Sequence, residues 1–104
     1  ISFAQRDHIW QLGHFLNPVL PKGALNFVNG TADTFSVFRT MPFWNTNTSM
    51  SDSLGELLFY TNGIYLANAN HDTLLNSDNF NPGSATTNNL FNGLNIAQGI
   101  CILP

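Results

Sequence analysis

The chain has 104 residues, of which 43% are hydrophobic and only 9% are charged, with a formal net charge of -3 and one cysteine. This length allows one domain or part of one, and the apolar content excludes an intrinsically disordered chain. Three Lys and Arg residues are too few for a nucleic-acid surface, one cysteine excludes an internal disulfide, and no apolar run approaches the length of a membrane span.

The first residues resemble the end of a secretory signal peptide. Ser2-Phe3-Ala4 is a small-x-small triplet of the kind that precedes signal cleavage. We therefore expect residues 1–4 to be a signal remnant and residues 5–104 to belong to a secreted or cell-surface protein. A surface solvated by Asn, Thr and Ser in place of charges is common in such proteins.

Strand signals dominate the rest of the chain, since no window keeps the apolar spacing of a helix. A short strand is expected at Ile9 to Leu12. Four more strands, rich in aromatic and β-branched residues or in Thr, are predicted near residues 35–40, 46–51, 56–61 and 64–68. The predicted fold is all-β, with these four strands forming an antiparallel meander.

Two turns support this meander. Asp52 is expected to accept hydrogen bonds from nearby backbone N–H groups, with Gly55 in the left-handed conformation. Asn62-Gly63 lies between two strand-like runs and is the pair that best tolerates a two-residue type I′ turn.

The remainder is less regular. Residues 69–95 form a long polar segment, which in a compact domain is either functional or poorly ordered. Residues 96–103 are apolar again and predict a further strand, in which Cys101 is a small buried hydrophobe.

The segment Met50 to Gly63 is similar to the "I-S-D-x-x-G-N-L-L-F-Y-T-D/N-G" segment of the N-terminal β-propeller-like region of Bacteroidetes-type secreted proteins. These proteins often carry gliding-motility-associated or type IX secretion sorting domains. Weaker similarities to the same family occur at Trp10 to Gly13, Ala24 to Phe27, Asn68 to His71 and Gln98 to Pro104. Departures from the pattern are Asn26, Glu56 and Ala67.

The resemblance implies an extracellular address and no established catalytic residues. It also implies that residues 5–104 are about one blade of a propeller with its flanking strands, because a propeller has several four-stranded blades. The remaining blades of the parent chain would then be partners of this one.

Catalytic and metal sites find little support in the sequence. Asp52 and Glu56 flank a turn and are more simply explained by it than by an acid–base pair. Asn68, Asn70 and Asp72 alternate like calcium ligands, but the glycine and glutamate that such a loop needs are absent. We expect no catalytic residue, no metal and no cofactor.

Aromatic residues are the best binding candidates. Trp44 with Asn45 and Asn47 would place a stacking face beside amides, and Tyr65 would be a second stacking residue. The simpler interpretation, which we favour, is that Phe43 and Trp44 pack on the core of the meander.

The function predicted first is a non-catalytic interaction or scaffold module of a secreted, adhesin-like protein, with protein or glycan partners at the cell surface. One alternative is a carbohydrate-binding module that uses exposed aromatic residues. Another is part of a propeller hydrolase whose active site lies mostly outside this chain.

Overall fold

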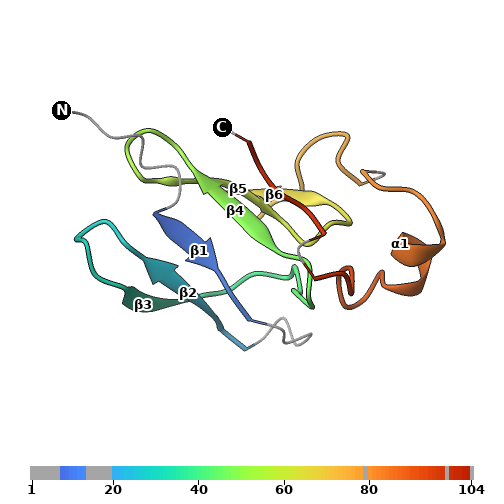
Figure 1. Cartoon of the computed structure of the whole chain (residues 1–104), viewed down its shortest axis with the longest axis horizontal. Helices are drawn as coiled ribbons and strands as arrows, with labels where there is room; N and C mark the ends of the chain where they lie inside the picture. Colours follow the sequence, from blue (N-terminus) through green and yellow to red (C-terminus); the bar gives the residue numbers. More distant parts are fainter. Residues whose placement is uncertain (1–7, 14–19, 79, 98, 104) are drawn as a thin grey trace.

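The computed structural model describes residues 8–13, 20–78, 80–97 and 99–103, and most of its regular structure is in two small antiparallel β-sheets (Figure 1). Their strand orders are β1-β2-β3 and β4-β5-β6. The elements are β1 (Ile9–Gln11), β2 (Lys22–Asn26), β3 (Asp33–Val37), β4 (Thr48–Ser51), β5 (Leu57–Thr61), β6 (Leu66–Asn68) and α1 (Ser84–Asn88). The all-β class is confirmed, whereas the expected signal remnant at 1–4 lies outside the described residues.

The predicted four-stranded meander has only three strands in the structure. The strand expected at 35–40 is β3, which ends at Val37 and pairs with β2, not with β4. The β2–β3 hairpin is closed around Asn29-Gly30, where the Gly30 N–H donates to the carbonyl of Phe27 at 3.0 Å. The chain then leaves this sheet, and β4 begins a separate sheet with β5 and β6.

The turn between β5 and β6 is also larger than predicted. The pairing of Thr61 with Leu66 leaves four residues between the strands, where a type I′ hairpin would leave two. Gly63 has a φ of 87°, but Asn62 does not have a positive φ. The Asn62 side chain instead accepts from the N–H of Ile64 at 3.1 Å and donates to the carbonyl of Pro42 at 3.0 Å. The type I′ prediction is therefore wrong, because this buried amide ties the turn to another loop.

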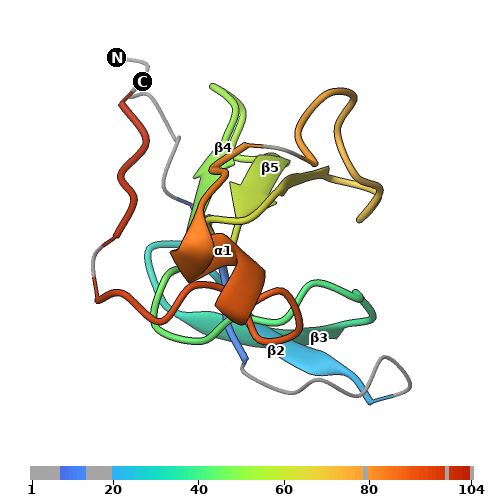
Figure 2. The ribbon, with the colours of Figure 1, turned by 90° about the vertical axis from the view of Figure 1, so that its right-hand side faces the viewer.

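The core is built mainly on the β4–β6 sheet. Its fully buried members are Met41, Phe43, Tyr60 and Ala67. The Phe43 and Tyr60 rings meet edge to face, with centroids 6.0 Å apart and planes at 84°. Phe43 and Met41 come from the connection between β3 and β4, which crosses between the two sheets that Figure 2 shows one above the other. This connection therefore supplies the packing that joins the sheets, and the prediction of a core position is confirmed for Phe43.

Two cations are buried beside this core. Lys22 and Arg39 are each 2% exposed. The Lys22 ammonium donates to the Arg39 carbonyl at 2.7 Å, and the Arg39 guanidinium donates to the carbonyls of Leu12 and Gly13. The same guanidinium lies 4.4 Å from the centroid of the Phe43 ring, within the range of a cation–π interaction. For Arg39, the contacts in the described part of the chain are thus backbone carbonyls and an aromatic face, in place of the carboxylate that usually accompanies a buried cation.

The described part of the segment after β6 runs back along the molecule and contains no further strand. The Leu94 N–H donates to the Asn62 carbonyl at 3.1 Å, and the Leu94 carbonyl accepts from Thr46 N–H at 3.0 Å. Helix α1 has no buried residue and lies at one end of the molecule (Figure 1). The long polar segment 69–95 thus contains this short helix and ends packed on the turn after β5.

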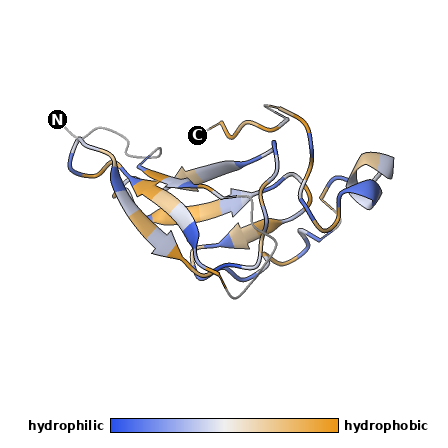
Figure 3. Cartoon of the chain, turned by 90° about the horizontal axis from the view of Figure 1, so that it is seen from below, coloured by the Kyte–Doolittle hydropathy of each residue, from blue (hydrophilic) through white to orange (hydrophobic). Residues whose placement is uncertain are grey.

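The strand predicted at 96–103 is not observed in the described part of that segment. Cys101 is exposed, so its assignment as a buried hydrophobe is wrong. The described residues of this apolar run are exposed or only partly buried, so the run does not enter the core. Figure 3 shows hydrophobic residues both there and within the strands, so hydropathy alone does not separate the two situations.

Candidate functional site

The two sheets meet at the edges of β1 and β4, where serine hydroxyls take the place of a backbone ladder. The N–H of Ile9 donates to the Ser51 hydroxyl oxygen at 3.1 Å, and the Ser49 hydroxyl donates to the Ile9 carbonyl at 2.7 Å. Ser51 is fully buried and Ser49 is partly buried. Ile9 is therefore the one position at which these hydroxyls hold the strands together.

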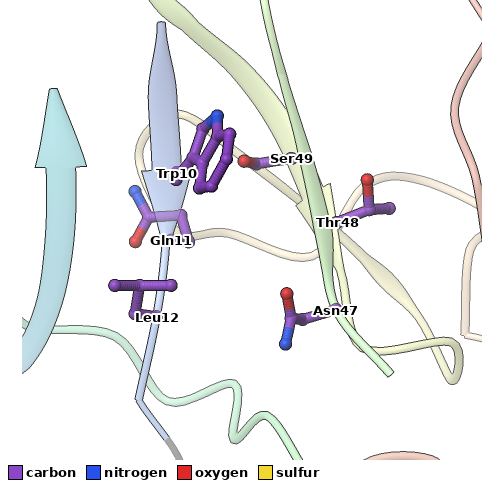
Figure 4. Close-up of a pocket in the computed structure, with 6 residues that line it drawn as sticks. All are labelled: Trp10, Gln11, Leu12, Asn47, Thr48 and Ser49. Atoms are coloured by element: carbon purple, nitrogen blue, oxygen red, sulfur yellow. The ribbon is translucent and has the colours of Figure 1, made fainter. Parts of the chain in front are cut away.

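Beyond Ile9 the strands separate and leave a cleft of about 280 Å³, which we call the seam cleft. Its lining residues are Trp10, Gln11, Leu12, Asn47, Thr48 and Ser49 (Figure 4). In Figure 4 the indole of Trp10 and the hydroxyl of Ser49 lie on facing sides of the gap, and Asn47 extends toward it from the same strand side as Ser49. None of these six side chains carries a charge.

Strand alternation explains why a tryptophan lies outside. In β1 the residues Ile9 and Gln11 are buried, whereas Trp10 is 48% exposed. Trp10 packs against Phe27, with ring centroids 5.1 Å apart and planes at 56°. The side-chain period of two along a strand thus places the larger aromatic ring on the outer face of the sheet.

The four predicted binding residues do not share one cleft with Trp10. Asn47 lines the seam cleft, and Tyr65 lines a different cleft of about 460 Å³ with Thr40, Pro42, Leu90 and Phe91. Trp44 is 38% exposed and is not one of the fully buried core residues, while the Asn45 side chain hydrogen-bonds to that of Asn95. Among the predicted candidates, Asn47 is thus the member that the seam cleft includes.

Trp10, Gln11 and Ser49 were not identified from the sequence as binding candidates. Hydropathy favours Trp10 inside and Gln11 outside, and the structure has the reverse orientation, with Gln11 only 3% exposed. The sequence feature that could have identified them is the alternation of side chains along a strand. If Ile9 is buried, Gln11 must be buried as well and Trp10 must lie on the other face. Ser49 had no local signal, since its role depends on a strand 40 residues away.

The predicted turn at Asp52 has the expected geometry. The Asp52 carboxylate accepts from the N–H groups of Leu54 at 2.8 Å and Glu56 at 3.1 Å, and Gly55 has a φ of 86°. The side-chain oxygen of Asn68 has the same role. It accepts from the N–H groups of Asn70 at 2.9 Å and Asp72 at 3.1 Å. These oxygens therefore organise turns. Within the described ranges, no group of three His, Cys, Asp or Glu side chains is arranged to hold a metal ion.

Tyr60, a core residue, makes a polar contact with His71. The Tyr60 hydroxyl and His71 Nδ1 are hydrogen-bonded at 2.8 Å, and His71 has a left-handed φ of 70°. Burial lowers the pKa of His71, with Arg39 acting in the same direction and Asp72 opposing it. Burial also raises the pKa of the Tyr60 phenol well above its usual value, and it lowers the pKa of Arg39 to about 10. These shifts favour a neutral imidazole beside a protonated phenol at neutral pH.

A second cleft, of about 340 Å³, opens between the two sheets near His71. Its lining includes Gln11 and Phe35 from the β1–β3 sheet, and Glu56 and His71 from the turns of the other sheet. Gln11 therefore lines both this cleft and the seam cleft.

No family model, curated protein or solved structure matches this chain. Of the described helices, none has both the length and the apolar character needed to cross a bilayer.

Proposed function

We propose that this chain is a non-catalytic interaction module of a secreted or cell-surface, adhesin-like protein. The observation that carries the proposal is the seam cleft, which combines an exposed aromatic ring with neutral amides and hydroxyls. Such a lining supplies contact area and hydrogen bonds without a group that titrates near neutral pH. This chemistry suits recognition better than acid–base or nucleophilic catalysis.

The resemblance of Met50 to Gly63 motivates the extracellular assignment and the propeller-like setting. In this proposal the two sheets belong to a larger β-propeller-like region, whose other blades cover part of their surface. Phe38 is 66% exposed, Leu75 is 90% exposed and Phe91 is 82% exposed, which supports the presence of covering neighbours.

Binding and turnover assays test the functional part. The chain, fluorescently labelled, is incubated with intact bacterial cells and with extracellular polysaccharide, and the bound fraction is measured by sedimentation. The full-length parent is assayed against glycoside and ester panels. We expect saturable surface binding and no turnover. Hydrolysis by the parent that is lost when a carboxylate of this chain is replaced would overturn the non-catalytic assignment in favour of the hydrolase alternative.

Thermal unfolding tests the blade-like part. Because neighbouring blades would cover its exposed apolar side chains, the separate chain is expected to be marginally stable and to unfold over a broad temperature range. A sharp, cooperative transition in a monomeric sample would contradict the assignment to a larger ring.

A further inference from the structure

One wall of the seam cleft is the Trp10 ring, which is supported by packing against a neighbouring residue. The Trp10 ring packs at a tilt against the Phe27 ring, and the N–H of Phe27 donates to the His8 carbonyl at 2.9 Å. Because β1 and β2 are paired along their length, with Trp10 opposite Leu25, the indole sits on a rigid strand and not on a loop. Trp10 is 48% exposed, so its ring offers a large apolar surface of fixed orientation beside the cleft.

The facing wall supplies neutral hydrogen-bonding groups. The Ser49 hydroxyl donates its one hydrogen bond to the Ile9 carbonyl, and its oxygen can still accept hydrogen bonds. The exposed Asn47 amide has two N–H donors and a carbonyl acceptor. Thr48, between them on β4, also lines the cleft. Both donors and acceptors therefore face the indole from the opposite strand.

The edge of β1 adds a further pair of polar groups. Leu12 N–H donates to Gly23, which shows that alternate residues of β1 direct their backbone groups toward β2. The residues between them, Ile9 and Gln11, direct theirs toward β4. The Ile9 groups are satisfied by two serine hydroxyls, while no partner among the described residues is found for the backbone N–H and C=O of Gln11.

Gln11 has an orphaned side chain as well. The residue is 3% exposed, and its Oε1 has no hydrogen-bond partner. Side chains alternate along β1, so the Gln11 amide lies on the buried face with Ile9, and only the backbone groups of Gln11 face the seam cleft. Polar groups are almost always paired in native proteins, so unpaired backbone groups at the edge of a cleft mark a position that another molecule can complete.

The local geometry distinguishes between occupants. An added peptide strand needs a row of free N–H and C=O groups, but the serine contacts at Ile9 leave Gln11 as a single free position on this edge. A charged ligand would find no opposite charge among the lining residues. A sugar ring fits better, because it has a face of C–H groups for the indole and a rim of hydroxyls that donate and accept.

From these contacts we infer that the seam cleft binds a neutral sugar residue, with Trp10 as the stacking platform and Asn47 and Ser49 as hydrogen-bonding partners. This inference rests on the proposed interaction function and names the ligand class for it. It also moves the stacking role from Trp44 and Tyr65, the residues predicted from the sequence, to Trp10.

The two tryptophans of the chain allow a direct test. In Trp44→Phe the fluorescence comes from Trp10 alone, and in Trp10→Phe it comes from Trp44 alone. Both replacements keep an aromatic ring, and Trp10→Phe preserves a contact for Phe27, which protects the fold. Each protein is titrated with neutral oligosaccharides of glucose, mannose, galactose and xylose, and affinity is also measured by calorimetry.

We expect a saturable change of Trp10 fluorescence with at least one neutral oligosaccharide. Trp10→Phe should weaken that affinity by about tenfold, because a phenyl ring offers a smaller stacking face than an indole at the centre of the site, while Trp44→Phe changes it less than twofold. Asn47→Ala should weaken it similarly, whereas Asn70→Ala, an exposed asparagine on a distant turn, serves as its control and should not.

Three outcomes overturn the inference. Affinity lost in Trp44→Phe but kept in Trp10→Phe would place the sugar elsewhere. Binding restricted to uronic-acid or sialylated glycans would contradict a neutral ligand. Absence of any glycan binding would refute the ligand class, and if surface binding of the chain persisted, the proposed interaction function would still stand.

Discussion

The turns at Asp52–Glu56 and Asn68–Asp72 have the same hydrogen-bond pattern. In each, the first side chain accepts two backbone N–H groups, and the first N–H donates to the fifth carbonyl, at 2.8 Å in one turn and 2.9 Å in the other. In each, the fourth N–H also donates back to the first carbonyl. The first turn follows β4, the second begins at the last residue of β6, and both end in an acidic residue.

The two turns differ at the fourth position, which is left-handed in both. Gly55 occupies it in the first turn with a φ of 86°, and His71 occupies it in the second with a φ of 70°. A left-handed conformation is inexpensive for glycine and costs other residues about 1–2 kcal/mol. His71 hydrogen-bonds to the buried Tyr60 hydroxyl, which offsets that cost. The two turns thus share one backbone geometry. In the first turn it only reverses the chain, whereas in the second it also places a side chain that hydrogen-bonds to the core residue Tyr60.

The largest expected effect is the loss of the first side chain. Asp52→Ala should lower the free energy of unfolding by about 2–3 kcal/mol, and Asn68→Ala by about 1 kcal/mol, because hydrogen bonds to a charged acceptor are stronger. Urea unfolding of both variants gives the two values, with Ser53→Ala as an exposed neighbouring control. Equal losses at the two turns would show that the carboxylate charge makes no difference.

The next effect separates backbone strain from side-chain contact. Gly55→Ala should cost about 1–2 kcal/mol, since it introduces a Cβ at a left-handed position. His71→Gly removes the same kind of strain but also removes the ring, so its net change should stay within about 1 kcal/mol. A Gly55→Ala variant as stable as the parent chain would rule out the strain argument.

A smaller effect measures the bond between Tyr60 and His71. A double-mutant cycle with Tyr60→Phe and His71→Asn should give a coupling of about 1 kcal/mol, the usual value for one partly buried hydrogen bond. Asparagine is chosen because it tolerates the left-handed conformation. Additive changes would show that the two side chains stabilise the core independently.

The smallest effect is a dependence of stability on pH. The pKa of His71 in the folded chain is lowered from its usual 6.5, so the unfolded chain binds more protons just below that pH. The His71 contribution is therefore complete above pH 6.5 and declines as the pH falls toward the lowered pKa. Unfolding free energies at pH 7.5, 6.5 and 5.5 should fall more steeply for the parent chain than for His71→Asn. Parallel pH profiles would contradict this role.

The asparagine–glycine pairs show how far local sequence reasoning reaches. Asn62-Gly63 was predicted to close a tight hairpin, but there the Asn62 amide bonds to Pro42 and the connection has four residues. Asn29-Gly30 was not singled out, yet it lies in the turn that pairs β2 with β3 and removes β3 from the predicted meander. The pair predicts a reversal of the chain, whereas packing around it decides which strands become neighbours.

The candidate site shows the same division. Asn47 was identified from its sequence because amides near aromatic residues suit polar ligands, and it does line the seam cleft. Trp10 could not be found in that way, since its partner wall is β4, far along the chain. The unpaired groups of Gln11 become visible only when the strand edges are known.

The sequence by itself determined the all-β class, the positions of β1, β4 and β5, and the turn that Asp52 organises. These depend on side-chain alternation, β-propensity and hydrogen bonds between residues close in the chain. Only the tertiary structure decided which strands share a sheet, that Lys22 and Arg39 are buried, and that Cys101 is exposed. Those outcomes depend on contacts between distant segments, such as the hydroxyls that join β4 to Ile9, and no local pattern records them.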